Sequence, residues 1–234
     1  MNRIQKIEVL QVNLQKAKLA QVEIGRQIKH FNKNSTPFIC FIQEPKVEKG
    51  KHSWQPNSCK KYSCAPNPRM VVYTDNNRTA WALESLNTRD ITAIQTKINN
   101  KSVIVASVYL DITCIKVIPD SLEKLMRYAE DKGLGVILCI DSNCHSQLFD
   151  PSTNKRGEAL ELFIAKYNLQ VENTCHTPTY ESRGAKTCID ITLTTRLSVS
   201  VTNWQALLTC QFVTLTERRV VRVMSMHVLA PRLS

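Results

Sequence analysis

The stretch Gly135-Val-Ile-Leu-Cys-Ile-Asp-Ser-Asn-Cys-His145 indicates the fold class of this chain. Its apolar centre is short and unbroken, which is typical of a strand buried on both faces of an α/β sheet. Three polar side chains, Asp141, Asn143 and His145, follow at alternate positions. α/β sheets bind ligands at this end of their strands, but Asp and Asn also favour turns for local reasons. From this stretch alone, two interpretations of the polar residues are equally open: the edge of an active site, and a turn without a function.

The same pattern, a buried strand that ends in a polar side chain, occurs elsewhere in the chain. One polar residue at a strand end carries no information, but a set spread over the whole chain does. Carboxylates from separate strands that meet at one edge form a hard-oxygen site suited to Mg²⁺ or Mn²⁺. The further predicted strands are 7–12, followed by Asn13; 38–43, followed by Glu44; 102–110, with Tyr109 and Asp111 at its end; and 188–193, which contains Asp190.

The composition fits a folded protein with a polyanionic partner. The 234 residues can form one sizeable domain, and 31 Lys and Arg against 20 Asp and Glu give a net charge of +11. Such a surplus of positive charge favours nucleic acid first and an acidic membrane second. No apolar run approaches the length of a membrane span, so we expect no membrane partner and no transmembrane segment.

The cysteines and the N-terminal sequence indicate the cellular compartment in which the protein is located. Nine cysteines, an odd number, together with the lack of a secretory signal at the N-terminus, predict free thiols and an intracellular location. No motif for a small-molecule cofactor is present.

A polar, lysine-rich segment from Lys46 to Pro68 is predicted to be a long loop. Its lysines are candidates for contacts with DNA phosphates, and the alternative is a solvated loop without a partner. These candidates are Lys46, Lys49, Lys51, Lys60 and Lys61.

The order and spacing of five short motifs resemble the endonuclease/exonuclease/phosphatase superfamily. The branch with the greatest similarity is the apurinic-like endonuclease domain of non-LTR retrotransposons, and the resemblance runs from Gln5 to Trp204. The motifs are Leu10-Gln-Val-Asn13-Leu, Ile42-Gln-Glu44-Pro, Ser107-Val-Tyr109-Leu, Ile140-Asp141-Ser-Asn143-Cys-His145-Ser and Thr187-Cys-Ile-Asp190-Ile-Thr192.

The resemblance implies a four-layer α/β sandwich with two mixed β-sheets and an active site at one end. It implies a metal, Mg²⁺ or Mn²⁺, bound by Glu44 with Asn13 close to it. Asp141 would deprotonate the attacking water, and a nick in DNA would prime reverse transcription, with the nucleus as the place of action. The remaining implied roles are Asn143 on the scissile phosphate, Tyr109 on the phosphate or leaving oxygen, Asp190 orienting a C-terminal histidine, and His145 as a further candidate at the site.

The chain departs from the family pattern near its C-terminus, where the Ser-Asp-His motif is absent. We therefore expect an endonuclease-like domain over 1–205 and a divergent tail over 206–234, disordered or out of frame, which leaves the sandwich incomplete at the C-terminus. Three functions stay open. The first is a metal-dependent DNA endonuclease, the second is an inactive remnant that only binds nucleic acid, and the third is a phosphatase of the same superfamily.

Overall fold

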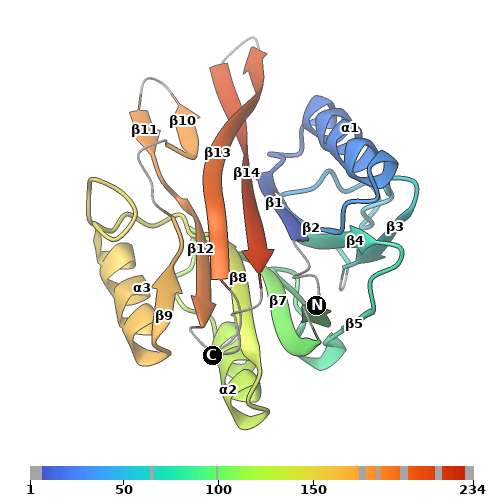
Figure 1. Cartoon of the computed structure of the whole chain (residues 1–234). Coiled ribbons are helices and arrows are strands. Elements are labelled where there is room, and N and C mark those ends of the chain that lie inside the picture. The colour runs from blue at the N-terminus through green and yellow to red at the C-terminus, as the bar shows by residue number, and fades with distance from the viewer. Residues whose placement is uncertain are drawn as a thin grey trace.

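Two mixed β-sheets lie face to face, with helices on their outer faces (Figure 1). The computed structural model describes residues 7–63, 66–98, 100–173, 178–182, 185–195, 200–213 and 218–229. Parallel and antiparallel pairs occur in both sheets, since β1–β2 and β7–β8 are parallel whereas their other neighbours are antiparallel. This architecture is the predicted four-layer α/β sandwich.

The first sheet has the order β11-β10-β14-β1-β2-β4-β3, with β13 also paired to β14. Its strands are β1 (Ile7–Asn13), β2 (Phe38–Gln43), β3 (Cys59–Tyr62), β4 (Met70–Asp75), β10 (Tyr180–Ser182), β11 (Ala185–Thr187), β13 (Ser200–Val213) and β14 (Arg218–Leu229).

The second sheet has the order β5-β6-β7-β8-β12-β9. Its strands are β5 (Ala80–Ala82), β6 (Ile91–Ile98), β7 (Lys101–Tyr109), β8 (Gly135–Asp141), β9 (Leu169–Val171) and β12 (Asp190–Thr195). The helices are α1 (Lys18–Lys33), α2 (Asp120–Asp131), α3 (Lys155–Lys166) and the short 3₁₀ helix η1 (Glu84–Leu86).

Successive side chains of a strand point to opposite faces, so each central strand contributes to two apolar layers. In β1, Val9 packs between the sheets, whereas Leu10 and Val12 face outward against Ile24 and Ile28 of α1. The outer face of the second sheet packs against α2 and α3 in the same way. This explains why the strands have nearly continuous apolar sequences, since both of their faces are covered.

The first turn of α3 lies against the loop that follows β8. The side chain of Asn154 caps this helix and accepts a hydrogen bond from the main-chain N–H of Gly157 at 2.8 Å. A Cβ atom on Gly157 would lie 1.7 Å from the carbonyl oxygen of His145. Only glycine permits this approach, which fixes the position of the loop that carries His145.

The C-terminal strands differ from the expectation that the sandwich is incomplete. β14 pairs antiparallel with β1 over Ile7–Val12 and with β13 along its other edge. β14 therefore fills the place beside β1 in the first sheet, and β13 runs through position 205, the predicted boundary between domain and tail. The main chain can pair in this way because ladder hydrogen bonds need no particular side chain.

The lysine-rich segment from 46 to 68 also differs from the prediction of one long loop. It contains β3, which pairs with β4 at the edge of the first sheet. Its sequence Cys-Lys-Lys-Tyr buries only the cysteine fully, which is why periodicity did not identify this edge strand.

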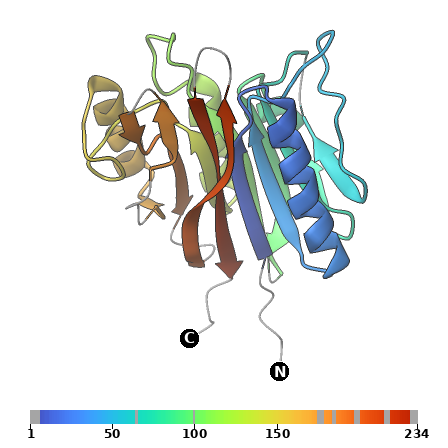
Figure 2. The same cartoon turned by 90° about the horizontal axis from the view of Figure 1, so that it is seen from above.

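The parallel pairs bring four strand ends to one end of the sandwich. β1, β2, β7 and β8 all finish there, because parallel neighbours share their direction. Figure 2 shows the start of β1 and the end of β14 at the lower edge, and the loops after β2 and β7 at the upper edge. None of the helices in the described part of the chain is long and apolar enough to cross a membrane.

Candidate functional site

Two buried glutamines align the two sheets just below the end of the sandwich at which β1, β2, β7 and β8 finish. Gln11 Nε2 donates to the carbonyl oxygen of Ile140 at 3.1 Å, and Gln43 Nε2 donates to that of Cys139 at 3.4 Å. Both glutamines are fully buried, so these bonds replace solvation that the side chains lose. They hold the ends of β1 and β2 over the end of β8.

The alignment places Asn13 against Asp141, although they are 128 residues apart in sequence. Asn13 Nδ2 lies 2.5 Å from Asp141 Oδ2, and Asn13 Oδ1 accepts from the main-chain N–H of Gln15 at 2.8 Å. The second bond fixes which end of the amide faces Asp141. The structure thus brings together the predicted ligand Asn13 and the predicted base Asp141.

Asp141 is almost entirely buried, and its Oδ1 has no hydrogen-bond partner among the described residues. Burial raises the pKa of this carboxyl group, the hydrogen bond from Asn13 lowers it, and the charge of Glu44 raises it again, to about 7 in all. A carboxylate with a pKa near neutrality is suited to accept a proton from water. Oδ1 is the oxygen of this carboxyl group that the hydrogen bond from Asn13 does not engage.

Glu44 and Asn143 both have left-handed backbone conformations, with φ of 44° and 47°. This region is costly for residues other than glycine and occurs at sites where the surrounding structure imposes it. Around Glu44 it is imposed by two main-chain bonds, from Lys16 N–H to Glu44 O at 2.9 Å and from Glu44 N–H to Arg69 O at 2.8 Å. The side chain of Asn143 is held by its Nδ2, which donates to Leu110 O at 3.2 Å.

Tyr109, at the end of β7, lies beside Asp141 in the parallel ladder. Burial raises the pKa of its hydroxyl group to about 12, and the charges of Glu44 and Asp141 contribute to the rise. The guanidinium group of Arg69 lies over the ring, 4.5 Å from its centre. Tyr109 therefore stays protonated at neutral pH and presents a hydrogen-bond donor at the site.

Arg69 was not among the residues predicted from the sequence. Its Nη2 donates to Asp111 Oδ2 at 2.8 Å and to Asp90 Oδ2 at 2.7 Å, and its Nε also bonds Asp90. Hydrogen bonds from Thr113, and then the charge and hydrogen bond of Arg69, lower the pKa of Asp111 to about 2. No local signal identifies Arg69, because its partners come from positions 21 and 42 residues further along the chain.

Asp190 and His145 occupy the side of the site formed by β8 and β12. Asp190 is buried and lies directly opposite Asp141 in the antiparallel ladder, and its main-chain N–H donates to Thr179 Oγ1 at 3.0 Å. His145 Nδ1 lies 3.4 Å from Asp150 Oδ1, a distance that suits an ion pair, although the angles do not form a hydrogen bond. Asp150, which sequence reasoning missed, therefore lies beside the His145 ring, and its oxygens accept hydrogen bonds from Ser152 and Cys188.

A cavity of about 320 Å³ opens beside Glu44, and lysine and arginine side chains supply much of its polar surface. Within the described residues, no group of three or more His, Cys, Asp and Glu side chains converges as a complete metal cage. Mg²⁺ is commonly bound by one or two carboxylates together with waters and substrate phosphates. Glu44, with Asn13 at the end of the neighbouring strand β1, fits such a partial ligand set. The cavity is lined by Lys16, Glu44, Pro45, Val47, Asn67, Pro68, Arg69 and Arg89.

The predicted lysine contacts fall into two groups. Lys46, Lys49 and Lys51 are exposed in the loop that follows Glu44, and Lys46 Nζ lies 2.7 Å from Glu48 Oε1. Lys60 and Lys61 instead lie on β3, and each donates its Nζ to a main-chain oxygen, that of Arg78 or that of His52, at 2.8 and 2.9 Å. The side-chain nitrogens of the second group are thus engaged by the protein itself, whereas the first group belongs to the loop that begins beside Glu44.

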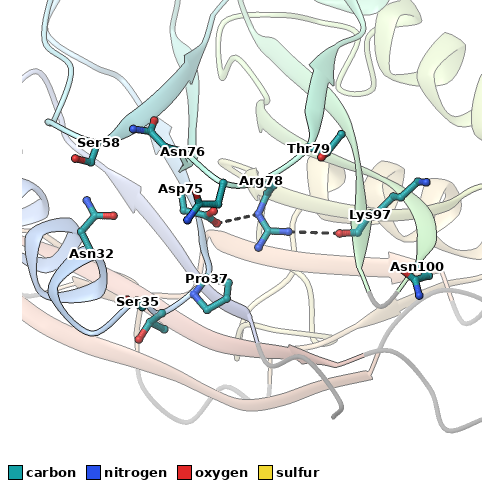
Figure 3. Close-up of a pocket in the computed structure, with 12 residues that line it drawn as sticks. Asn32, Ser35, Pro37, Ser58, Asp75, Asn76, Arg78, Thr79, Lys97 and Asn100 are labelled. Atoms are coloured by element: carbon teal, nitrogen blue, oxygen red, sulfur yellow. Dashed lines mark hydrogen bonds and ion pairs between the residues drawn. The ribbon is translucent and has the colours of Figure 1, made fainter. Parts of the chain in front are cut away.

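A second cavity, of about 690 Å³, lies at the opposite end of the sandwich, where β4 ends and β2 begins (Figure 3). Its buried cation, Arg78, lies 3.2 Å from Asp75 Oδ2 and donates to Lys97 O at 3.4 Å. Arg78 thus joins the end of β4 to the end of β6. This cavity is remote from Asp141, and we assign it no part in the chemistry of the site.

Comparisons with known proteins find one matching family model and several solved structures of similar fold. The sequence model of a family described as "Endonuclease-reverse transcriptase" matches residues 103–210, which include Tyr109, Asp141, Asn143 and Asp190. No curated protein matches the sequence.

Solved structures show the same fold at low sequence identity. The endonuclease domain of TRAS1, a telomere-specific non-LTR retrotransposon, has a TM-score of 0.70 and 19% identity, over 94% of this chain and 98% of that one. An endonuclease/exonuclease/phosphatase family protein from Bacteroides thetaiotaomicron has a TM-score of 0.64 and 13% identity, over 99% and 100%. The catalytic domain of human Nocturnin, with bound sulfate, has a TM-score of 0.60 and 14% identity, over 96% and 94%.

The family match includes four strands of the second sheet, β7 from residue 103 onward, β8, β9 and β12, together with the polar residues at the ends of β7, β8 and β12. The structural matches extend the agreement to both sheets. In its sequence match over residues 103–210 and in its fold, the chain is similar to the endonuclease/exonuclease/phosphatase superfamily.

Proposed function

We propose that this chain is a divalent-metal-dependent DNA endonuclease domain of a non-LTR retrotransposon, which nicks target DNA in the nucleus and leaves a 3′ end that primes reverse transcription. The observation that carries the proposal is the buried carboxyl group of Asp141, bonded to Asn13 of the other sheet and next to Glu44 and Tyr109. The similarity to the endonuclease domain of TRAS1 supports the retrotransposon branch. The net charge of +11 supports a nucleic-acid substrate.

Glu44, with Asn13 beside it, would hold Mg²⁺ or Mn²⁺, which when bound neutralises charge on the scissile phosphate. Asp141 takes the proton of the attacking water on its free Oδ1. Asn13 keeps the other oxygen of Asp141 in place through its hydrogen bond.

The remaining residues contact or position the substrate. Tyr109 donates its phenolic proton in a hydrogen bond to a phosphate oxygen, and Arg69 fixes the Tyr109 ring from above. Asn143 rotates its amide from Leu110 O toward the phosphate when substrate is bound. Asp190 faces Asp141 across the ladder, where we propose that it positions the side chains that contact the phosphate. His145 lies near them, with Asp150 beside its ring.

A plasmid-nicking assay tests this function. Wild-type protein with Mg²⁺ should convert supercoiled plasmid to the nicked form, and both EDTA and either Glu44→Gln or Asp141→Asn should stop the conversion. Asp131→Asn, an exposed carboxyl at the end of α2, is the matched control and should nick like the wild type. If the folded wild-type protein nicks no plasmid, the proposed endonuclease activity is contradicted.

The missing Ser-Asp-His motif favours a second candidate, an inactive remnant that only binds nucleic acid. This candidate predicts DNA binding without cleavage, and affinity that is unchanged in Glu44→Gln. A version of the chain with a Ser-Asp-His ending separates the two, since it would restore nicking only if the other residues of the site are competent. Release of phosphate from small phosphate esters, without nicking, would instead favour a phosphatase.

A further inference from the structure

The lysine-rich loop after β2 begins with a short hairpin, which we call the lysine hairpin (Lys46–His52). Glu48 and Lys51 exchange main-chain hydrogen bonds of 2.9 and 3.0 Å, and the two residues between them, Lys49 and Gly50, have φ of 49° and 78°. Positive φ at both central residues is typical of the tight turn that hairpins favour. The lysine hairpin therefore has a defined shape, and all three of its lysines are exposed.

The buried imidazole ring of His52 closes the base of the lysine hairpin. His52 Nδ1 donates to Lys46 O at 2.8 Å, and its Nε2 lies 2.9 Å from the hydroxyl group of Tyr73 in β4. The same hydroxyl group donates to Trp54 O at 2.6 Å, and the three rings pack edge to face. His52 is 4% exposed and Tyr73 is fully buried. These contacts attach the lysine hairpin to the first sheet.

The hydrogen bonds determine where a neutral His52 ring carries its proton. Nδ1 faces a carbonyl oxygen, which can only accept, so Nδ1 carries the proton and Nε2 is left as an acceptor. The hydroxyl group of Tyr73 then has one proton for two acceptors, His52 Nε2 and Trp54 O. A protonated ring would donate from both nitrogens and add one hydrogen bond, but it would place a positive charge in a buried site. One additional hydrogen bond gains less free energy than the desolvation of a buried charge costs.

The groups around the ring also oppose its protonation. Lys61 of β3 donates its Nζ to His52 O at 2.9 Å, and its charge repels an imidazolium. Burial lowers the pKa of His52 from 6.5, the hydrogen bond of Nδ1 raises it, and the charge of Lys61 lowers it, with a net decrease. The other ionisable groups of this cluster, Tyr73 and the thiols of Cys40 and Cys59, stay neutral because burial raises their pKa values. The charged side chains of the lysine hairpin itself are exposed, where solvent screens them.

The base of the lysine hairpin lies close in sequence to the predicted metal ligand. Lys46, whose carbonyl oxygen accepts from His52, is two residues after Glu44. The residue between them is Pro45, and its ring fixes φ, so the connection is stiff. A displacement of the base is therefore transmitted to Glu44 as well as to the lysine side chains.

We propose that His52 is a positioning residue, whose neutral ring holds the lysine hairpin in place beside Glu44 and whose protonation releases it. In the released hairpin the ring is solvated and has its ordinary pKa of 6.5, whereas the pKa in the attached hairpin is lower. The attached form thus binds fewer protons, so its advantage is fully present above pH 6.5 and is lost as the pH falls through the lower pKa. The inference rests on the proposed function and adds regulation by pH to it.

Proteolysis after Glu48 measures release of the lysine hairpin without DNA, metal or nicking. The wild-type protein is treated at pH 7.5 and pH 5.5 with a glutamate-specific protease that is active at both values. The free peptide of residues 44–58 corrects for the protease itself. We expect the corrected cleavage rate to be up to about tenfold higher at pH 5.5, because a solvated imidazole is about tenfold more often protonated than neutral one pH unit below its pKa.

Three variants separate a titrating contact from a merely structural one. His52→Asn keeps a donor for Lys46 O but does not titrate, so its corrected cleavage should not depend on pH. Tyr73→Phe leaves Trp54 O without its donor and should accelerate cleavage roughly fivefold at both pH values. His30→Asn, which removes an exposed histidine of α1, is the matched control and should behave like the wild type.

DNA binding in EDTA measures the consequence for the lysines. The ratio of wild-type affinity to His52→Asn affinity should fall by up to about tenfold from pH 7.5 to pH 5.5. The ratio removes the effect of every other histidine, since these are common to both proteins. A constant ratio would show that the lysine hairpin does not regulate DNA binding.

Two results of the proteolysis would overturn the inference: the same pH dependence in the wild type and His52→Asn, or slower cleavage of the wild type at pH 5.5 than at pH 7.5. If cleavage follows pH as expected but the wild type never nicks DNA, the proposed function fails and the role of His52 stands. If nicking depends on Glu44 and Asp141 while cleavage after Glu48 is independent of pH, the role of His52 fails and the proposed function stands.

Discussion

Replacing Asp141 with asparagine should abolish nicking and at the same time stabilise the metal-free protein at neutral and higher pH. The carboxyl group is buried at 2% exposure, and its pKa is raised to about 7 by burial, against the hydrogen bond from Asn13 and with the charge of Glu44. The ionised form is thus disfavoured in the folded state. Asparagine has nearly the same shape and carries no charge, so the substitution removes this cost.

The sign of the pH dependence follows from the linkage between folding and the protonation of Asp141. In the unfolded chain this carboxyl loses its proton near its ordinary pKa of 3.8, whereas the folded protein keeps the proton up to about 7. The contribution of Asp141 to stability is therefore fully present below pH 3.8, falls as the pH rises, and is lost above pH 7. At 1.36 kcal/mol for each pH unit between these values, the loss has an upper bound of roughly 4 kcal/mol.

Urea denaturation of the wild type and Asp141→Asn, in EDTA at pH 5 and pH 8, measures this contribution. The measured quantity is the unfolding free energy of the variant minus that of the wild type. This difference should be roughly 1 to 3 kcal/mol larger at pH 8 than at pH 5. Titrating groups that do not interact with Asp141 are common to both proteins and cancel in the difference, and Asp131→Asn should show no pH-dependent difference. The same difference at both pH values, or a smaller one at pH 8, would refute the burial argument.

Three other predictions concern the scaffold, the metal and the DNA contacts. Gly157→Ala should lower the unfolding free energy by about 2 kcal/mol or more, because the new Cβ would lie 1.7 Å from a main-chain oxygen, and an unchanged urea midpoint would contradict this. Millimolar Mg²⁺ should raise the melting temperature of the wild type but not of Glu44→Gln, and an equal rise in both would exclude Glu44 as a ligand. Lys46→Glu should weaken DNA binding and flatten its salt dependence, whereas Lys60→Glu should not, because Lys60 lies on β3 and bonds the carbonyl oxygen of Arg78. Equal effects of the two lysine substitutions would place the DNA elsewhere.

Local sequence was sufficient to predict the central strands and the polar residues at their ends. The apolar run before Asp141 predicted a strand buried on both faces, and β8 has that burial throughout. Local sequence could not predict β3 as a strand or the pairing of β14 with β1. Edge strands carry little hydrophobic signal, and pairing between distant segments depends on main-chain hydrogen bonds that no residue type specifies.

The candidate site shows the same division. The sequence by itself determined which residues could do chemistry, namely Asn13, Glu44, Tyr109, Asp141 and others at the ends of apolar strands, since periodicity fixes where a buried strand stops. Only the tertiary structure decided that Asn13 lies 2.5 Å from Asp141, that Arg69 lies over Tyr109, and that Asp150 lies beside His145. These contacts depend on the stacking of two sheets and on the loops between them, so side chains far apart in sequence meet only after the chain has folded.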